Sequence, residues 1–490
     1  MASQPSYHIT ACLIEIWQEP DKQKLHLTPS NPMVLTEVSD IEIEDNYQNL
    51  IGTAAVRFPR GTVIRRTLDS VAAESDKNQV TAEMTHNGVV AETRSNSHLA
   101  SVSDFKVGSR IRIYLGYLLP TQLDVLKWTD VTSHKATVWN DSTTRENYKK
   151  YLTKMFDGYI VKCSLDTPVE LYCENLAHGL KLKTCPTHKA GKNLTTDDLF
   201  GENGQFKLLD GTGLRLHPDT IKAPVDVGPI NLTDDLTVAD VLTEWSKYRL
   251  YAFIENDDNG IPCVKVGQTY FSKMGTKNDG CTERKSIARE NGSDSKNLPT
   301  PDILFDYHVA ENNLTLMEAD KKFLCVEATA LGSDKKFFHV TLRENPEWKN
   351  GDSPDNRWQF LNETKLSKKA MKLGARPLGK GNDHVSLNKY TVIPYFSRKI
   401  GISKEDLMVE AVRHYENWNM NGIEGTITIF GDFPIISGNR VHITDRFHSA
   451  KNGYYLVGKV HTVFGLNGYR QTLNLPYCIK LDSKEEKTDE

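Results

Sequence analysis

The run Gly425-Thr-Ile-Thr-Ile-Phe-Gly431 begins the part of this chain that decides its fold. Three pieces of the same character follow, namely Ser437-Gly-Asn-Arg-Val-His-Ile443, Gly453-Tyr-Tyr-Leu-Val-Gly-Lys-Val460 and Gly468-Tyr-Arg-Gln-Thr-Leu-Asn-Leu475. Each piece is short, alternates apolar with polar residues, and is bounded by Gly, Asn, Asp or Pro. The pattern is typical of consecutive antiparallel strands, and we predict a β-meander that closes into a small barrel.

Length and composition describe a globular protein of several domains. At 490 residues, two to four domains are expected. The net charge of −4 provides no basic footprint, so specific nucleic-acid binding is not expected. No apolar run is long enough to cross a bilayer, and the first residues lack a basic signal-peptide region, so we expect no membrane span and no cleaved leader.

A weak internal repeat links the C-terminal run to the first third of the chain. Gly108-x-Arg110-Ile111-x-Ile113 matches Gly438-x-Arg440-Val441-x-Ile443. In the next strand of each, Gly158-Tyr-Ile-Val161 matches Tyr455-Leu-Val457. Strand and turn patterns also repeat by chance in β proteins, so duplication of one β unit and coincidence both remain open at this point.

A segment of different character lies between the two repeat halves. Thr237-Val-Ala-Asp240 is a capping box, and apolar residues that include Trp245 follow at helical spacing. A strand at 250–254, an Asp257-Asp-Asn-Gly260 turn and a strand at 261–267 come next. We therefore predict a small α+β domain, built on a helix and a hairpin.

The final strands carry a resemblance to a known family. Four of these strands resemble the last barrel of tail-hub proteins of tailed phages. They are the strand ending in Phe430-Gly431-Asp432, the Gly-x-Arg strand, the Tyr-Tyr-Leu-Val strand that runs into Val460-His461-x-x-Phe464, and the closing Gly-Tyr-Arg-x-Thr-Leu strand. These include the late control protein D family and the hub part of contractile injection spike proteins. The resemblance covers about 33–476 and implies a mainly β chain with two similar antiparallel β-barrels and a small α+β middle domain.

The resemblance also implies an assembly. Three copies would form a ring of six quasi-equivalent barrels, a homotrimer that joins a sixfold tail tube to a threefold central spike. The implied partners are the tail tube or distal tail protein, the spike protein and the end of the tape-measure protein. The implied place is the virion tail or baseplate of a phage or prophage-derived injection machine, assembled in the host cytoplasm. The implied role is structural and not enzymatic.

These observations divide the chain into six parts. Residues 1–32 are expected to form an arm or, by preference, an edge strand, residues 33–184 the first barrel, residues 185–270 the α+β domain and residues 271–300 a polar linker. The second barrel is expected over 301–478, with strands at 303–309, 322–328 and 336–342 and a helix at 403–418, and a disordered charged tail over 479–490. Four long polar stretches, 68–104, 118–154, 272–300 and 344–388, are the expected places of partner-specific contacts. Helix core faces are expected to hold Trp245 and Trp418.

Signals for chemistry are weak. Cys173, His178, Cys185 and His188 have the right ligand types for zinc, but their spacing is irregular and a buried thiol is the ordinary occupant of a strand position, so we assign no metal, cofactor or catalytic residue. The eight cysteines contain no CxxC and are expected to be free thiols. No hydrolase or nucleotide-binding motif is present. Arg110 and Arg440 could line a ring or pair between protomers, although exposure on a strand is the preferred interpretation.

Two other functions remain open. One is a tail-associated cell-wall hydrolase, in which a hub-like scaffold carries an enzyme. The shortness of the sequence after the last strand argues against a C-terminal enzymatic domain. The other is a carbohydrate- or receptor-binding β protein.

Overall fold

The structure is a computed structural model. It describes residues 9–18, 32–59, 63–66, 84–86, 89–91, 97–99, 105–119, 142–165, 168–189, 191, 194–222, 224, 226–228, 230–246, 250–257, 259–268, 301–317, 324–331, 337–345, 357–361, 375–377, 391–397, 402–418, 422–431, 435–476 and 478–482. The predicted linker at 271–300 lies outside these residues, as does most of the stretches 68–104, 118–154 and 344–388.

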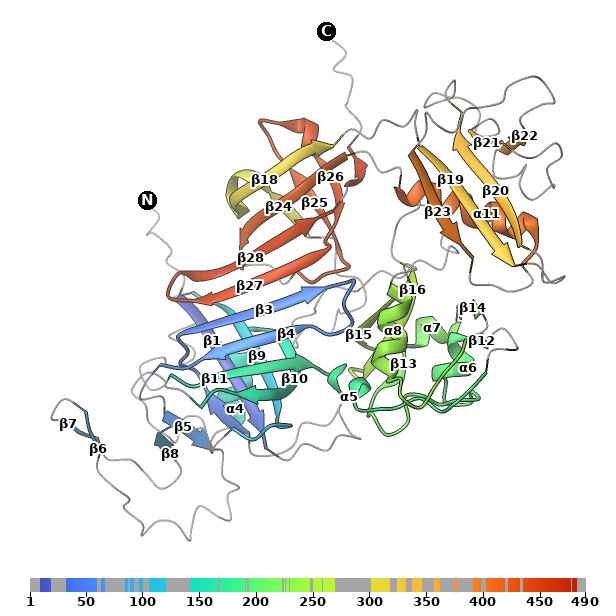
Figure 1. The fold of residues 1–490 in the computed structure, drawn as a ribbon. Helices are drawn as coiled ribbons and strands as arrows, with labels where there is room; N and C mark the ends of the chain where they lie inside the picture. Colours follow the sequence, from blue (N-terminus) through green and yellow to red (C-terminus); the bar gives the residue numbers. More distant parts are fainter. Residues whose placement is uncertain are drawn as a thin grey trace.

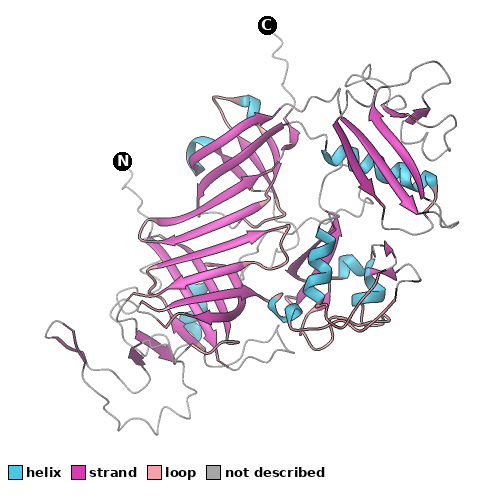
Figure 2. Cartoon of the chain, viewed as in Figure 1, coloured by secondary structure: helices cyan, strands magenta, loops and turns pink. Residues whose placement is uncertain are grey.

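The protein is mainly β, and one large sheet runs through most of it (Figures 1 and 2). Thirteen strands follow each other in the order β18-β24-β28-β27-β3-β4-β11-β10-β9-β1-β2-β5-β8. The sheet joins two β units that are far apart in sequence, drawn in blue to teal and in yellow to red in Figure 1.

The first unit curls its strands around one apolar core. Ile14, Ile41, Val56, Ile113 and Leu171 from five different strands meet there. Its elements are β1 (Ile9–Trp17), β2 (Met33–Leu35), β3 (Asp40–Asn46), β4 (Thr53–Arg57), β5 (Val63–Arg66), β6 (Met84–His86), β7 (Val89–Ala91), β8 (Ser97–Leu99), β9 (Arg110–Leu118), α4 (Ser142–Lys149), β10 (Thr153–Cys163) and β11 (Glu170–Asn175).

The predicted edge strand at the N-terminus is instead an interior strand. β1 pairs with β9 over its whole length and with β2 on its other side. The reason is its composition: Leu13, Ile14 and Ile16 are all buried, and a strand with apolar side chains on both faces is stable only inside a sheet that is covered on both sides.

The second unit packs two sheets around a separate core. The four-stranded sheet β17-β25-β26-β29 faces the strands β18, β24, β28 and β27 of the large sheet. Its elements are β17 (Asp302–Leu304), α9 (Phe305–His308), β18 (Val309–Met317), β24 (Gly422–Phe430), β25 (Arg440–Thr444), η6 (Ser449–Lys451), β26 (Gly453–Leu456), β27 (Lys459–Gly465), β28 (Gly468–Leu475) and β29 (Cys478–Leu481). The disordered tail was expected to begin at residue 479, but residues 479–481 belong to β29, so that boundary is too early. Residues 483–490 lie outside the described chain.

Two of the three strands expected to open the second barrel form a domain of their own, in orange on the right of Figure 1. The third, 303–309, lies in the second unit, where it is divided among β17, α9 and the start of β18. β19 (Leu324–Leu331), β20 (Phe337–Glu344), β21 (Trp358–Phe360), β22 (Ala375–Pro377) and β23 (Thr391–Phe396) make a five-stranded sheet on which α11 (Lys404–Trp418) packs. Leu407, Ala411 and Tyr415 of the helix need an apolar surface, which Val326 and Val340 supply. The boundary 301–478 therefore combines two cores. The side chain of Trp418 lies outside the described part.

The predicted helix and hairpin of the middle domain are present. Asp240 and Thr237 exchange capping-box hydrogen bonds, with Asp240 N–H donating to Thr237 Oγ1 (3.2 Å) and Thr237 N–H donating to Asp240 Oδ2 (2.9 Å). Trp245 is buried against Phe200. The elements are α5 (His178–Lys181), β12 (Leu194–Thr195), α6 (Thr196–Phe200), β13 (Arg215–Leu216), α7 (Pro218–Lys222), β14 (Asp226–Gly228), α8 (Val238–Ser246), β15 (Leu250–Asn256) and β16 (Pro262–Gln268).

In the described residues, no helix has both the length and the apolar character needed to span a membrane.

Candidate functional site

The two β units meet where β27 pairs with β3. The antiparallel pairing runs from Lys459 opposite Asn46 to Gly465 opposite Asp40. It converts two separate sheets into one, and backbone hydrogen bonds hold its register. We call this contact the junction.

Aromatic side chains reinforce the junction. The Tyr117 hydroxyl donates to the carbonyl oxygen of Tyr469 (2.8 Å), and the two ring centroids are 5.6 Å apart. Phe464 and Tyr469 belong to the second unit, yet they complete the core of the first. Each unit therefore buries apolar surface that it would expose alone.

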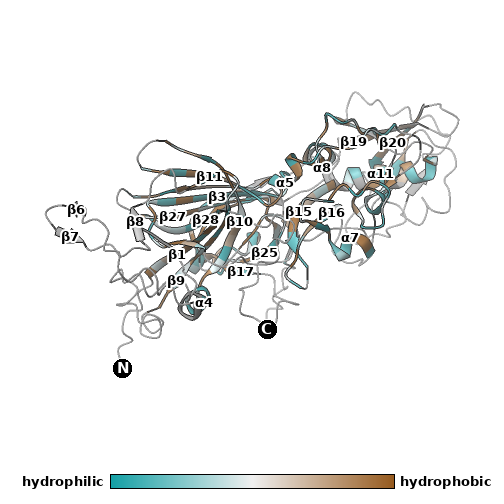
Figure 3. Cartoon of the chain, turned by 90° about the horizontal axis from the view of Figure 1, so that it is seen from below, coloured by the Kyte–Doolittle hydropathy of each residue, from teal (hydrophilic) through white to brown (hydrophobic). Residues whose placement is uncertain are grey.

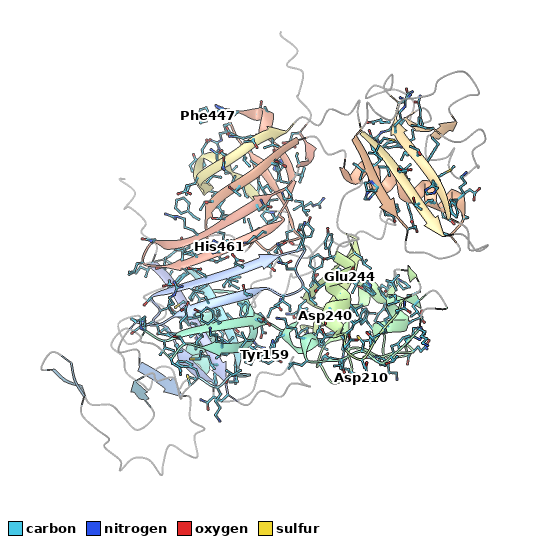
Figure 4. All side chains as sticks on the ribbon, in the orientation of Figure 1. Tyr159, Asp210, Asp240, Glu244, Phe447 and His461 are labelled. Atoms are coloured by element: carbon cyan, nitrogen blue, oxygen red, sulfur yellow. The ribbon has the colours of Figure 1, made fainter. Side chains whose placement is uncertain are left out.

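Polar contacts surround the aromatic ones. Lys459 Nζ lies 3.0 Å from Glu44 Oε1, and the Ser437 N–H donates to Asp45 Oδ2 (3.0 Å). Beside them a groove of about 430 Å³ opens on the sheet surface, and His461, labelled in Figure 4, is one of the residues that line it. The groove is lined mainly by polar side chains, among them Glu44, Asn46, Gln48, Thr426, Lys459, Thr472 and Asn474.

One face of the large sheet is polar across the junction. Buried and less buried residues alternate along its strands, so the apolar side chains point to the two cores and the polar ones to the opposite side. Figure 3 shows the mixed hydropathy along these strands. The charged side chains on the polar face include Asp40, Glu42, Glu44, Arg57, Lys162, Glu170, Glu174, Glu311, Glu424, Lys459 and Arg470. Acidic groups outnumber basic ones in this set.

The sequence repeat corresponds to one turn built twice. In the first unit, Gly108 N–H donates to Ile160 O (2.8 Å) and Ile160 N–H donates to Ser109 O (2.9 Å). In the second, Gly438 N–H donates to Val457 O (2.7 Å) and Val457 N–H to Asn439 O (2.8 Å). Gly108 and Gly438 have φ of 87° and 80°, a conformation that favours glycine. The repeat is thus a shared local geometry. The hydrogen bonds match Ile160 with Val457, so the sequence comparison, which placed Val161 opposite Val457, was wrong by one residue in this strand.

The matched turn defines which strands are equivalent. The order β10-β11-β4-β3 in the first unit corresponds to β27-β28-β24-β18 in the second. Cys163 follows Ile160 by three residues, as Val460 follows Val457, so Cys163 and Val460 are equivalent.

The pairing across the sheet does not return to the equivalent residue. From Cys163 it leads through Leu171, Val56 and Ile41 to Phe464. Phe464 lies four residues beyond Val460, so four strands accumulate an offset of four residues. One residue of offset per strand is the ratio found in closed barrels, where strands tilt by about 36°.

Arg110 contradicts the expectation of an exposed strand residue. Its side chain is 1% exposed and makes two hydrogen bonds to Asp157, of 2.9 and 3.0 Å. Arg112 binds the same carboxylate at 3.0 Å. Burial alone would raise the pKa of Asp157, but the charges of Arg112 and Arg110 outweigh it and hold that pKa below its ordinary value. The equivalent Arg440 is half-buried, and its guanidinium lies 5.9 Å from the ring centroid of Tyr454.

The four candidate zinc ligands are not brought together. Cys173 and Cys185 belong to different cores, and burial raises the pKa of Cys185 to about 11. His178 Nδ1 is 2.8 Å from Glu174 Oε2, while His188 packs on Phe206. Within the described ranges no group of three His, Cys, Asp or Glu side chains is arranged to hold a metal ion.

No family model and no curated protein matches the chain. Among solved structures, the chain is similar to a tail protein from Neisseria meningitidis MC58 (10% identity, TM-score 0.45, covering 95% of this chain and 96% of that one). It is also similar to the 43 kDa tail protein of prophage MuSo2 from Shewanella oneidensis (7% identity, TM-score 0.43, 96% and 97%). A third is the prophage tail protein gp18 from Listeria monocytogenes EGD-e (7% identity, TM-score 0.40, 95% and 94%).

Proposed function

We propose that this chain is a structural hub of a phage-type tail or of a related injection machine, and that its copies close into a ring. In this proposal three copies form the ring, which joins a tail tube to a central spike in the virion baseplate, with the end of the tape-measure protein as a further partner. The number of copies and the partners follow from the resemblance of the final strands to tail-hub proteins of the late control protein D type. The role is structural and not enzymatic.

The observation that carries the proposal is the register at the junction. Two equivalent four-stranded units already lie side by side in one sheet, with the strand offset of a closed cylinder. Repeating the same step around a circle makes every contact between units alike, which is the condition for a closed ring.

Pairing with a second copy requires an open strand edge at each end of the two four-stranded units. β18 is the last strand of the large sheet, and no other described strand pairs with its outer edge. The matching surface begins at the end of β10, at residues 162–163, which are equivalent to 459–460 of β27 and lie beyond the last pair with β9 at Tyr159. In the ring, β18 of one copy would lie beside β10 of the next, as β3 lies beside β27 within the chain.

Three copies would contribute six four-stranded units. With strands about 4.8 Å apart and tilted by about 36°, such a cylinder has a diameter of roughly 45 Å. The two apolar cores lie on its outside, so the polar, mainly acidic face would line its channel. A channel of this kind is hydrated, and its few apolar side chains, such as Tyr172, form no large apolar patch to which a passing polymer could adhere.

The test is the native mass of the purified chain as its concentration is raised. The ring predicts a trimer with three times the 55.3 kDa of one chain. The double variant Asn312→Lys and Thr315→Lys places charge on the exposed edge strand β18 and should shift the species towards 55.3 kDa, because lysines on an edge oppose strand pairing. Thr243→Lys on the exposed side of α8 adds a lysine elsewhere and should leave the mass unchanged. A parent chain that stays at 55.3 kDa at every concentration, with and without tube protein, contradicts the ring.

A further inference from the structure

Two large apolar side chains are exposed at places whose counterparts in the repeat are partly or fully buried at the junction. Phe447, in the turn after β25, is 80% exposed, and Leu165, in the β10–β11 hairpin, is 85% exposed. A single exposed apolar residue is ordinary in a folded protein. These two are different because the repeat assigns each of them a counterpart at the junction, where the counterparts are covered.

By its position after the matched arginine, Phe447 corresponds to Tyr117, although Tyr117 lies within β9 and Phe447 lies in the turn after β25. Each lies seven residues after the matched arginine, Arg440 in the second unit and Arg110 in the first. Tyr117 crosses the junction and contacts Tyr469, at the start of β28 in the neighbouring unit. Phe447 lies at the other end of the second unit from His461 and the junction, where the described part of the chain leaves it in solvent (Figure 4).

The turn that carries Phe447 is rigid. The Asp445 carboxylate accepts hydrogen bonds from the N–H groups of Phe447 (2.7 Å) and His448 (2.8 Å), and it pairs with Lys451 at 2.6 Å. The next side chain, Arg446, lies over the ring of Tyr307 in α9, directly before β18. The exposed phenyl ring is therefore held beside the start of the open edge strand, at little further cost in conformational entropy on binding.

Leu165 corresponds to Thr462 of the other hairpin. It lies five residues after Ile160, as Thr462 lies five residues after Val457. Thr462 is 1% exposed. The neighbouring side chains of its hairpin, Phe464 and Tyr469, are packed in the core of the first unit. Among the described residues no equivalent unit covers the β10–β11 hairpin, and Leu165 remains in solvent.

We propose that Phe447 of one copy packs against the β10–β11 hairpin and Leu165 of a second copy of this chain, repeating between chains the contact that Tyr117 and the β27–β28 hairpin make within it. The inference rests on the proposed ring and identifies the side chains that close it. The partner is a second copy because the contact continues the junction by one step, with the same strands in the same order. Phe447 and Leu165 are the apolar anchors of this contact, surrounded by the paired backbones of β18 and β10.

The experiment compares four chains by native mass across a concentration series: the parent, Phe447→Ser, Leu165→Ser and Leu466→Ser. Leu466 is the matched control, since it is 98% exposed at the tip of the other hairpin and the contact does not include it. Each of the first two variants should raise the concentration at which the trimer forms at least tenfold, and Leu466→Ser should not. Equal behaviour of all three variants overturns the proposed contact.

A cross-linking arm separates this contact from the ring itself. Phe447→Cys and Leu165→Cys are made in a Cys163→Ser parent, because the thiol of Cys163 lies in the same hairpin and is only partly buried. The two chains are prepared separately, mixed, and treated with a short bismaleimide. A cross-linked pair should form in the mixture and be absent from each variant alone and from the parent. A chain that reaches the mass of the trimer without a cross-link in the mixture refutes the contact and leaves the ring. A chain that never associates and never cross-links refutes both.

Discussion

The cluster of Asp157 with Arg110 and Arg112 allows a test of what stabilises the first unit. The perturbation is Asp157→Asn, which removes the charge but keeps the size. Both guanidinium groups are then left in the interior without their carboxylate, and Arg110 is one of the largest fully buried side chains. Removing one member of a buried ion pair costs about 3–5 kcal/mol, most of it the desolvation of the charge that remains.

The magnitude can be compared with an exposed ion pair in the same sheet. Glu44 and Lys459 are 3.0 Å apart, but their side chains are 51% and 41% exposed, so solvent screens them. Glu44→Gln should therefore cost less than about 1 kcal/mol. The two variants remove the same charge and differ in burial, which makes Glu44→Gln the control.

The assay is amide hydrogen exchange in β9 and β10, since a chain with several cores does not unfold in one step. Asp157→Asn should lower the protection of these amides by roughly hundredfold or more, at about 1.4 kcal/mol for each factor of ten. Glu44→Gln should change it by less than about fivefold. Replacing all three residues together, as Arg110→Met, Asp157→Leu and Arg112→Met, should restore much of the protection, because no buried charge is then left.

The pH dependence has a definite sign. The folded pKa of Asp157 lies below its unfolded value of about 3.9, so its contribution is complete above that pH and is lost as the pH falls towards the folded pKa. Acidification below about pH 4 should loosen β9 and β10 in the parent and have less effect in Asp157→Asn. Equal losses in Asp157→Asn and Glu44→Gln, or a parent whose protection rises on acidification, would refute this reasoning.

Two further predictions concern single positions. At Gly425 the φ is 139° and an added Cβ would overlap the Asn313 carbonyl oxygen, so Gly425→Ala should separate β18 from β24 and destabilise the second unit by about 2 kcal/mol or more. Gly108 has a φ of 87° but open space around it, so Gly108→Ala should destabilise the first unit by only about 1 kcal/mol. Denaturation monitored by hydrogen exchange in each unit compares the two variants. Burial raises the pKa of Cys12 to about 12 and that of Cys173 still further, so a thiol reagent at pH 8 should label neither in the folded chain and both in denaturant, as read by mass spectrometry of peptides; rapid labelling of either in the folded chain would contradict its place in the core.

Local signals in the sequence were sufficient for the elements that depend on neighbouring residues. The capping box at Thr237 and the Asp257-to-Gly260 turn are found where they were predicted. The final pieces are strands as well, but the predicted meander is wrong: β24 pairs with β28 and β25 with β26, and the piece 453–460 is divided between β26 and β27, which lie in different sheets. The repeat at Gly108 and Gly438 was readable as well, because a positive φ before a Gly-x-Arg strand limits which residues can stand there.

Pairing between distant segments was not readable. The N-terminal strand was placed at an edge because periodicity reports which faces of a strand are apolar and not how many neighbours it has. In the same way, the strands at 324–331 and 337–344 were assigned to the second barrel, since nothing in their own residues indicates that α11 would take them into a separate core. The burial of Arg110 depends on Asp157, 47 residues away.

The sequence alone therefore determined the strand-rich character, the turns and caps, and the Gly-x-Arg motif that occurs twice, since each follows from backbone preferences within a few residues. Only the tertiary structure decided that β27 pairs with β3, that this pairing advances by one residue per strand, and that Phe447 and Leu165 remain exposed. Those features depend on backbone hydrogen bonds and buried surface that are shared by segments far apart in the chain, such as β3, which contains Glu44, and β27, which contains Lys459. No local pattern of residues indicates such a contact.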